Sequence, residues 1–145
     1  MRDKPCLTSA DIEKAMAACK AEAQRNKWNV AIAIVDDGGF LLYFERMEGV
    51  AGISAEVAIG KTRTAALTRR PSKIFEERVK ERPAFLNFPA GVLIQGGLPI
   101  MARNECVGAI GVSGVQSHQD EHIAQAGVAA IFVSEAARGP SIGST

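Results

Sequence analysis

The chain has 145 residues, 47% of them hydrophobic, which is enough for one compact domain and too few for two. Its 17 Lys and Arg residues nearly balance 16 Asp and Glu residues, giving a formal charge of +1. That balance argues against a nucleic-acid partner, which favours a strongly basic surface. No apolar run approaches the roughly 20 residues that span a bilayer, and the charged N-terminus lacks an apolar signal core. We therefore expect a single cytoplasmic domain over residues 1–145, without membrane contact.

The N-terminal third of the chain predicts a helix followed by a β-hairpin. The helix begins after Thr8 or Ser9, either of which can cap it, and it ends near Asn26. The apolar run 30–35 is typical of a buried strand, and a second strand returns after an Asp-Asp-Gly-Gly turn. Glycine adopts positive φ readily, so this turn suits a hairpin.

The middle of the chain predicts two helices and an irregular loop. Residues 54–68 form a helix rich in small side chains, and residues 72–81 form a shorter, highly charged helix after Pro71. Pro83 and Pro89 then bracket an apolar loop.

The last part of the chain predicts three strands in a meander and a final helix. The strands are expected at 91–95, 98–102 and 106–112, the helix at 118–137, and a disordered tail at 138–145. Pro99 has no N–H to donate, so its strand should lie at an edge or leave that position unpaired. The order α-ββ-αα-βββ-α predicts an α/β (α+β) fold, in which helices flank a five-stranded antiparallel sheet.

The cysteines and histidines leave two interpretations open. Three cysteines without a CxxC pair argue against a disulfide framework or a structural zinc site, and Cys19 and Cys106 fit buried positions. His118 and His122 lie four residues apart on one helix face, as a metal-ligating pair would. The acidic residue of an HExxH motif is missing, and an exposed polar turn also explains these histidines.

The glycine-rich segment 108–114 immediately precedes the last helix. Its glycines allow close backbone approach, and the helix N-terminus offers free N–H groups to a carboxylate or phosphate. The spacing differs from a dinucleotide fingerprint. Alternatively, Gly108 and Gly111 let a helix pack closely on the sheet.

Basic residues are concentrated between residues 61 and 73. Most are expected to be solvated, but Lys61 shares a helix side with small residues and can reach a bound anion. Arg46, at the end of the hairpin, suits bidentate binding of a carboxylate. No Ser-His-Asp order, nucleophile elbow or pair of carboxylates for glycoside hydrolysis is evident. These cations indicate an anionic small molecule as partner.

Five motifs occur in a specific order along residues 7–137. They are Arg46–Gly49, Gly60–Ala65, Gly96–Ile100, Gly108–Gly114, and Asp120-Glu121 together with Ala124–Gly127. In this order and spacing they resemble the GlcG/HbpS-like family, which includes the C-terminal domain of PduO-type proteins. Glu48 stands where this family usually has Asp. The loop 82–89 is distinctive, and its two phenylalanines are expected to line a pocket beside Gly96 and Gly97.

The resemblance implies an α-β-α, profilin-like sandwich around a five-stranded antiparallel sheet. It also implies homo-oligomers and, for some members, binding or degradation of heme, while others are accessory proteins encoded with catabolic enzymes. Secreted heme-sensing members carry a signal segment, which this sequence lacks, so an extracellular sensing role is not expected.

We therefore expect a small-ligand binding protein of this type, either a heme-binding protein or an accessory protein of a catabolic pathway, with heme as the candidate cofactor. The candidate ligand-binding residues are Arg46, Lys61, Phe85, Phe88, Gly96, Gly97, Ser113 and Gly114. His118 and His122 are the candidate ligands of a heme iron.

An enzyme is the alternative hypothesis: an isomerase, tautomerase or hydrolase acting on a small unsaturated or oxo carboxylate. Lys61 and Arg46 would hold the anion, and the Ser113-Gly114 backbone would stabilise developing negative charge. The candidate catalytic residues are Lys61, Glu48 and Asp120, of which either acid could transfer protons. A third hypothesis is a structural oligomer that binds no ligand.

Overall fold

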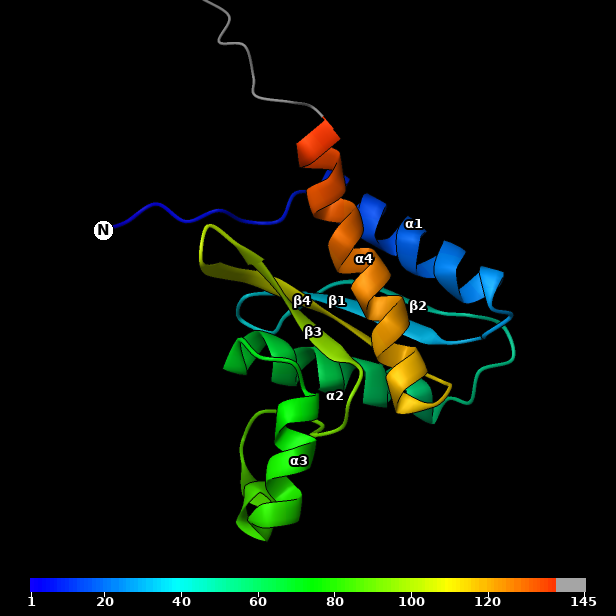
Figure 1. The fold of residues 1–145 in the computed structure, drawn as a ribbon, viewed down its shortest axis with the longest axis vertical. Helices are drawn as coiled ribbons and strands as arrows, with labels where there is room; N and C mark the ends of the chain where they lie inside the picture. Colours follow the sequence, from blue (N-terminus) through cyan, green and yellow to red (C-terminus); the bar gives the residue numbers. More distant parts are fainter. Residues whose placement is uncertain (138–145) are drawn as a thin grey trace, which may run out of the picture.

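The computed structural model describes the backbone of residues 1–137 and the side chains of residues 1–132. Its elements are α1 (Ser9–Arg25), β1 (Ala31–Asp36), β2 (Leu41–Arg46), α2 (Ile53–Thr68), α3 (Lys73–Glu81), the 3-10 helix η1 (Pro83–Asn87), β3 (Gly97–Ala102), β4 (Glu105–Ser113) and α4 (Ser117–Ala137) (Figure 1). The fold class is α+β, as expected. The tail 138–145, expected to be disordered, lies outside the described residues.

The four strands form one antiparallel sheet in the order β2-β1-β4-β3. Strand β1 lies inside the sheet, where Ile34 pairs with Tyr43 of β2 and with Ile110 of β4. Strands β2 and β3 form the two edges. Pro99 belongs to β3, so the prediction that this proline lies in an edge strand is confirmed.

The prediction of five strands is wrong, because the expected strand at 91–95 does not form. Hydrogen bonds hold this segment to two helices: Val92 N donates to Gly60 O, Thr64 Oγ1 to Val92 O, Ser72 Oγ to Ile94 O, and Gln95 N to Glu76 Oε2. Gly91 and Gly96, near its ends, have φ values of 146° and 137°, which bend the chain away from strand geometry. Apolar composition alone could not reveal these helix contacts.

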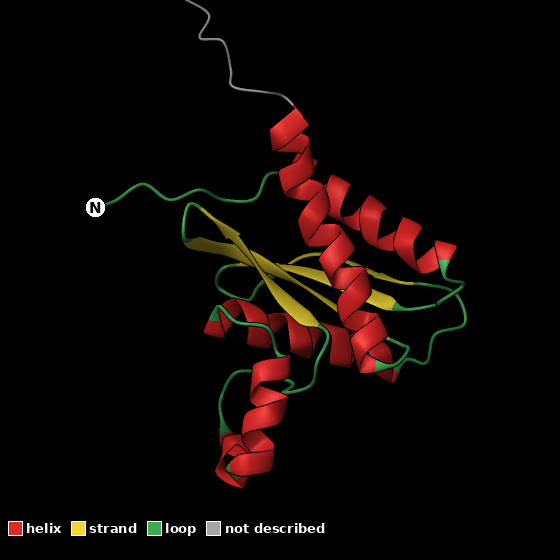
Figure 2. Ribbon diagram, viewed as in Figure 1, coloured by secondary structure: helices red, strands yellow, loops and turns green. Residues whose placement is uncertain are grey.

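Helices cover both faces of the sheet (Figure 2). α1 and α4 pack against each other on one face, and α2 packs on the other. The side chains of β1 alternate between these layers: Ile32 and Ile34 enter the core under α1 and α4, whereas Ala31 and Ala33 face α2. The small alanines let α2 lie close to the sheet.

Glycines bring α2 still closer to the strands. A Cβ on Gly111 would overlap the hydroxyl of Thr62 and lie 2.7 Å from the carbonyl oxygen of Ala58. A Cβ on Gly97 would likewise overlap the backbone carbonyl of Lys61. Gly111 therefore allows α2 to pack closely on the sheet, which is one of the two interpretations of the glycine-rich segment.

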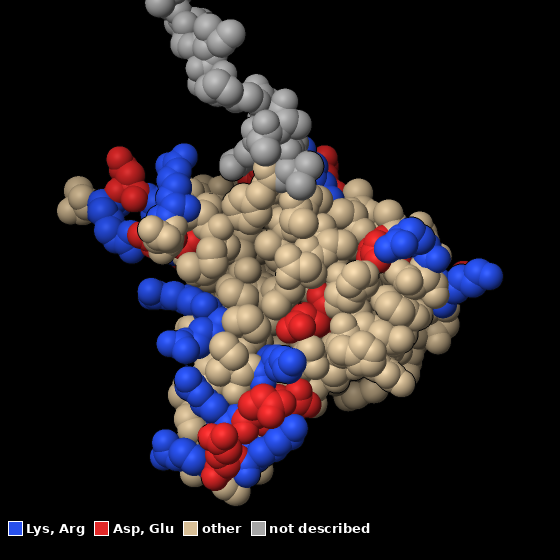
Figure 3. All heavy atoms as spheres, viewed as in Figure 1, with Lys and Arg blue, Asp and Glu red and all other residues tan. Residues whose placement is uncertain are grey.

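α3 and η1 form an arm that projects from the rest of the fold (Figure 1). Phe75 of α3 is buried at the base of an aromatic cluster within this arm. Figure 3 shows Lys, Arg, Asp and Glu side chains gathered over α3, while the face formed by α4 is mostly uncharged. Among the described residues, no helix combines the length and apolarity needed to cross a membrane.

Candidate functional site

Lys61 and Asp120 form a buried ion pair between α2 and α4. The Lys61 Nζ lies 3.0 Å from Asp120 Oδ2, and each side chain is 2% exposed. Nζ also donates to the Val112 carbonyl at 3.1 Å, and Asp120 Oδ1 accepts the Val115 N–H at 3.1 Å. Burial raises the pKa of the Asp120 carboxyl, and the nearby Lys61 ammonium acts in the opposite direction. The pair thus joins the two helical layers.

Gly96 and Gly97 make room for this lysine. Gly96 has a φ of 137°, and a Cβ there would lie 2.8 Å from Lys61 Nζ. Gly97 donates its N–H to Ser72 Oγ at 2.9 Å. The structure therefore places Gly96, Gly97, Lys61 and Asp120 together, with the polar groups of the ion pair bonded to one another or to the backbone.

The other predicted residues include Ser113 and Gly114, which lie between Val112 and Val115, the two residues whose backbone bonds to the ion pair. Arg46 of β2 and Ser113 of β4 both pair with Ala31, so they occupy one row across three strands. Ser113 is buried, Arg46 is exposed, and Gly114 lies against backbone atoms of residues 29 and 30. Glu48 is exposed in the loop after β2. Arg46 therefore lies on the edge strand β2, two strands across the sheet from Ser113.

The two predicted histidines have different surroundings. His122 Nε2 lies 2.6 Å from Glu22 Oε1, and its ring meets Trp28 edge-on with centroids 6.3 Å apart. A side-chain hydrogen bond from Arg25, and a weaker contribution from His122, lower the pKa of the Glu22 carboxyl. His118 is exposed one turn earlier. Among the described residues, no three His, Cys, Asp or Glu side chains are arranged to hold a metal ion.

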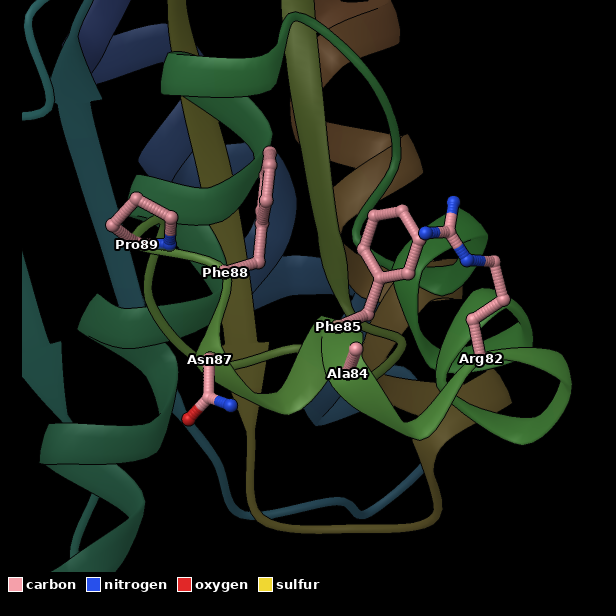
Figure 4. A pocket seen from close by; sticks show the side chains of 6 residues that line it. All are labelled: Arg82, Ala84, Phe85, Asn87, Phe88 and Pro89. Atoms are coloured by element: carbon pink, nitrogen blue, oxygen red, sulfur yellow. The ribbon is translucent and has the colours of Figure 1, made fainter.

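Phe85 and Phe88 line a hollow in the arm with a volume of about 310 Å³ (Figure 4). Its other lining residues are Arg82, Ala84, Asn87 and Pro89. Phe88 and Pro89 also line a second hollow of about 310 Å³, whose other walls come from α2, α3, Arg70 between these helices, and Ala90. Each volume falls in the range of small-molecule sites, about 300–1,000 Å³.

Three phenylalanine rings and two of the three lining arginines contact one another in the walls of these hollows. The rings of Phe75 and Phe88 stack with centroids 5.4 Å apart, and Phe85 lies 5.6 Å from Phe88. The Arg78 guanidinium lies 5.2 Å from the Phe75 centroid, and that of Arg82 lies 5.3 Å from the Phe85 centroid. These cation–π contacts hold two positive charges beside aromatic surface.

Phe85 and Phe88 were predicted as ligand-binding residues from the sequence, whereas Phe75, Arg78 and Arg82 were not. These three residues are spaced three and four positions apart, which places them on one face of α3 and its end. This helical spacing is the sequence feature that could have identified them as neighbours. The hollow was expected beside Gly96 and Gly97, but neither glycine is among its lining residues.

Comparison with known proteins gives a consistent result. Residues 7–129 match the family described as haem degrading protein HbpS-like. Protein GlcG of Escherichia coli K12 is 42% identical over 114 residues, which are 78% of this chain and 85% of GlcG. A double mutant of HbpS from Streptomyces reticuli superimposes with a TM-score of 0.82 at 30% identity, covering 89% of both chains. A PduOC:heme complex superimposes with a TM-score of 0.81 at 25% identity, covering 87% of this chain and 95% of that one.

These matches extend over most of the described sheet and its covering helices. They agree with the five motifs that carried the resemblance in the sequence. The chain belongs to the HbpS-like family.

Proposed function

We propose that this protein binds heme, or a similar flat and apolar dicarboxylate, in the hollow lined by Phe85 and Phe88. The single observation that carries the proposal is the combination of aromatic surface with the guanidinium groups of Arg78 and Arg82. The heme complex of PduOC, which has a similar fold, adds support from a relative.

The chemistry of the hollow matches two parts of heme. The porphyrin ring is a broad apolar surface, and its burial against Phe85 and Phe88 is favourable at roughly 25 cal/mol per Å² of apolar area. The propionates are carboxylates, which arginine binds through two parallel hydrogen bonds. Arg82 lines one hollow, and Arg70 and Arg78 line the other. A ligand lying across Phe88 would therefore meet arginines from both hollows.

The enzyme hypothesis has no specific observation in its favour. It required Lys61 to hold a substrate anion, but the Lys61 ammonium is bonded to Asp120 and to a backbone carbonyl. Asp120, a candidate acid, is occupied by the same pair and by the Val115 N–H.

A hemin titration of matched variants tests the proposal. Phe88→Ala removes the ring shared by both hollows and is expected to raise the hemin dissociation constant about tenfold or more. Phe40→Ala is the control, because Phe40 is 73% exposed in the β1–β2 turn. It should change the constant by less than about twofold. Equal binding by the two variants would place heme elsewhere.

We also propose that copies of the chain associate through the edge strand β2. Its Leu41, Leu42 and Tyr43 are 51%, 42% and 41% exposed, and apolar edge strands readily pair with another strand. The other edge, β3, contains Pro99, which cannot donate to such a pair. A second copy of β2 can supply the missing antiparallel partner.

Light scattering after size-exclusion chromatography tests this association. Leu42→Lys should lower the measured mass, because a lysine on an edge strand opposes pairing. Leu86→Lys is the control: Leu86 is the more exposed leucine, and it lies on the arm. If only Leu86→Lys lowers the mass, the copies meet through the arm instead.

A further inference from the structure

We infer that the hollow recognises the porphyrin ring and its carboxylates but supplies no ligand to the central metal. Metal-free protoporphyrin should then bind about as tightly as heme. This inference rests on the proposed function and extends its ligand from heme to porphyrin dicarboxylates with or without a metal.

The first observation is the chemistry of the walls. The lining side chains of both hollows are aromatic, aliphatic, proline, arginine, asparagine and threonine. Heme iron in proteins is held by His, Cys, Met or Tyr, and none of these lines either hollow. The only hydroxyl in the walls, that of Thr68, already donates to the Thr64 carbonyl at 2.6 Å.

The second observation concerns where such ligands lie among the described residues. Both histidines are on α4, and His122 is engaged by Glu22. Cys19 and Cys106 are buried and face backbone carbonyls, whereas Cys6 is exposed in the N-terminal segment. The tyrosine is on β2, and the methionines lie at the N-terminus, on α1 and β3, and after β2. None belongs to α3 or η1.

The third observation is the charge of the hollow. Among the described residues, neither Arg78 nor Arg82 forms an ion pair or a side-chain hydrogen bond, and both guanidinium groups lie over the Phe85 ring. Their centres are 5.7 Å and 5.3 Å from its centroid. Two unpaired cations beside one aromatic surface suit two carboxylates on one edge of a flat ligand. The porphyrin propionates have this arrangement whether or not a metal is bound.

The test compares three ligands by calorimetric titration: hemin, protoporphyrin IX and protoporphyrin IX dimethyl ester. We expect the dissociation constants of hemin and protoporphyrin IX to agree within about threefold. The ester, which lacks carboxylates, should bind at least about tenfold more weakly. Hemin binding more than about tenfold tighter than protoporphyrin IX would overturn the inference.

Two sets of variants separate failure of this inference from failure of the proposed function. Phe88→Ala should weaken hemin and protoporphyrin IX equally, and the His118→Ala/His122→Ala double variant should leave both the affinity and the Soret band of bound hemin unchanged. If the histidine variant moves the Soret band while Phe88→Ala still weakens binding, the proposed function is retained. The inference that the protein supplies no ligand to the metal is then wrong. If Phe88→Ala matches Phe40→Ala for every ligand, the proposed function itself fails.

Discussion

The Lys61 ammonium nitrogen lies 3.0 Å from the Asp120 carboxylate, and this contact joins the helix below the sheet to the helix above it. Such a contact needs a gap at the start of β3, which the missing side chain of Gly96 provides. Charges removed from water in this way are destabilising unless they are paired. The pair therefore couples the packing of α2 and α4.

Removing one partner of this pair should strongly destabilise the fold. Lys61→Met leaves the Asp120 carboxylate buried and unpaired, and we expect the free energy of unfolding to fall by about 3–5 kcal/mol. Urea denaturation measures the change. The matched control is Lys80→Met, which removes an exposed pair with Glu77 at 3.4 Å and should cost less than about 1 kcal/mol. A Lys61→Met loss no larger than the control loss would mean that the pair contributes little.

Adding one methyl group at Gly111 should separate α2 from the sheet. Its Cβ would overlap the Thr62 hydroxyl, so Gly111→Ala is expected to destabilise the fold by about 1–3 kcal/mol. At Gly52 a Cβ would meet only the flexible end of Arg46, at 3.1 Å, and Gly52→Ala should stay within about 1 kcal/mol. Thermal unfolding followed by circular dichroism compares the two. Similar melting temperatures would show that α2 can shift freely.

The buried Cys19 thiol predicts a loss of stability in alkaline solution. Burial raises its pKa from 9.0 to about 12, so between these values the unfolded thiol ionises while the folded thiol keeps its proton. The folded state then binds more protons, and stability falls as the pH rises. At pH 10.5, which is 1.5 units above 9.0, wild type should have lost about 2 kcal/mol relative to Cys19→Ala.

Urea denaturation of wild type and Cys19→Ala at pH 7.5, 9.0 and 10.5 measures this difference. Using the alanine variant as reference cancels the pH dependence that the two proteins share. A difference between the two proteins that stays constant across this pH range would contradict the raised pKa.

The N-terminus of α1 predicts a smaller effect. The Thr8 hydroxyl accepts the Asp11 N–H, and the Asp11 carboxylate accepts the Thr8 N–H, which together form a capping box. Thr8→Ala should therefore cost about 1 kcal/mol in chemical denaturation. Ser9→Ala at the first helical residue is the control and should be within about 0.5 kcal/mol of wild type. Reversed effects would identify Ser9 as the cap.

Most helices and strands could be predicted because their signals are local. The Asp-Asp-Gly-Gly turn indicated the hairpin, and Thr8 and Pro71 marked helix starts that the structure confirms within two residues. The segment 91–95 could not be assigned correctly, because its backbone bonds to groups on α2 and α3 that are distant in sequence. A short apolar run is equally consistent with a strand or with a chain held by its neighbours.

The candidate site was only partly predictable for the same reason. Lys61 was expected near small residues, but its partner Asp120 is 59 positions away, and sequence spacing did not connect them. The loop phenylalanines stood out by composition, whereas Arg78 and Arg82 looked like ordinary surface charge. Their role as cations beside aromatic rings depends on how η1 folds back against α3.

The projecting arm also has an architectural consequence. Residues 72–90 leave the body and return to it close together, where Ser72 bonds to Gly97 and Val92 bonds to Gly60. The sheet is complete without them, since no strand of the described fold lies inside this stretch. The arm is thus an insertion between α2 and β3 that adds no strand to the sheet. With the ligand site that we propose, exchanging residues 72–90 between relatives should transfer ligand preference while the four-stranded sheet is kept.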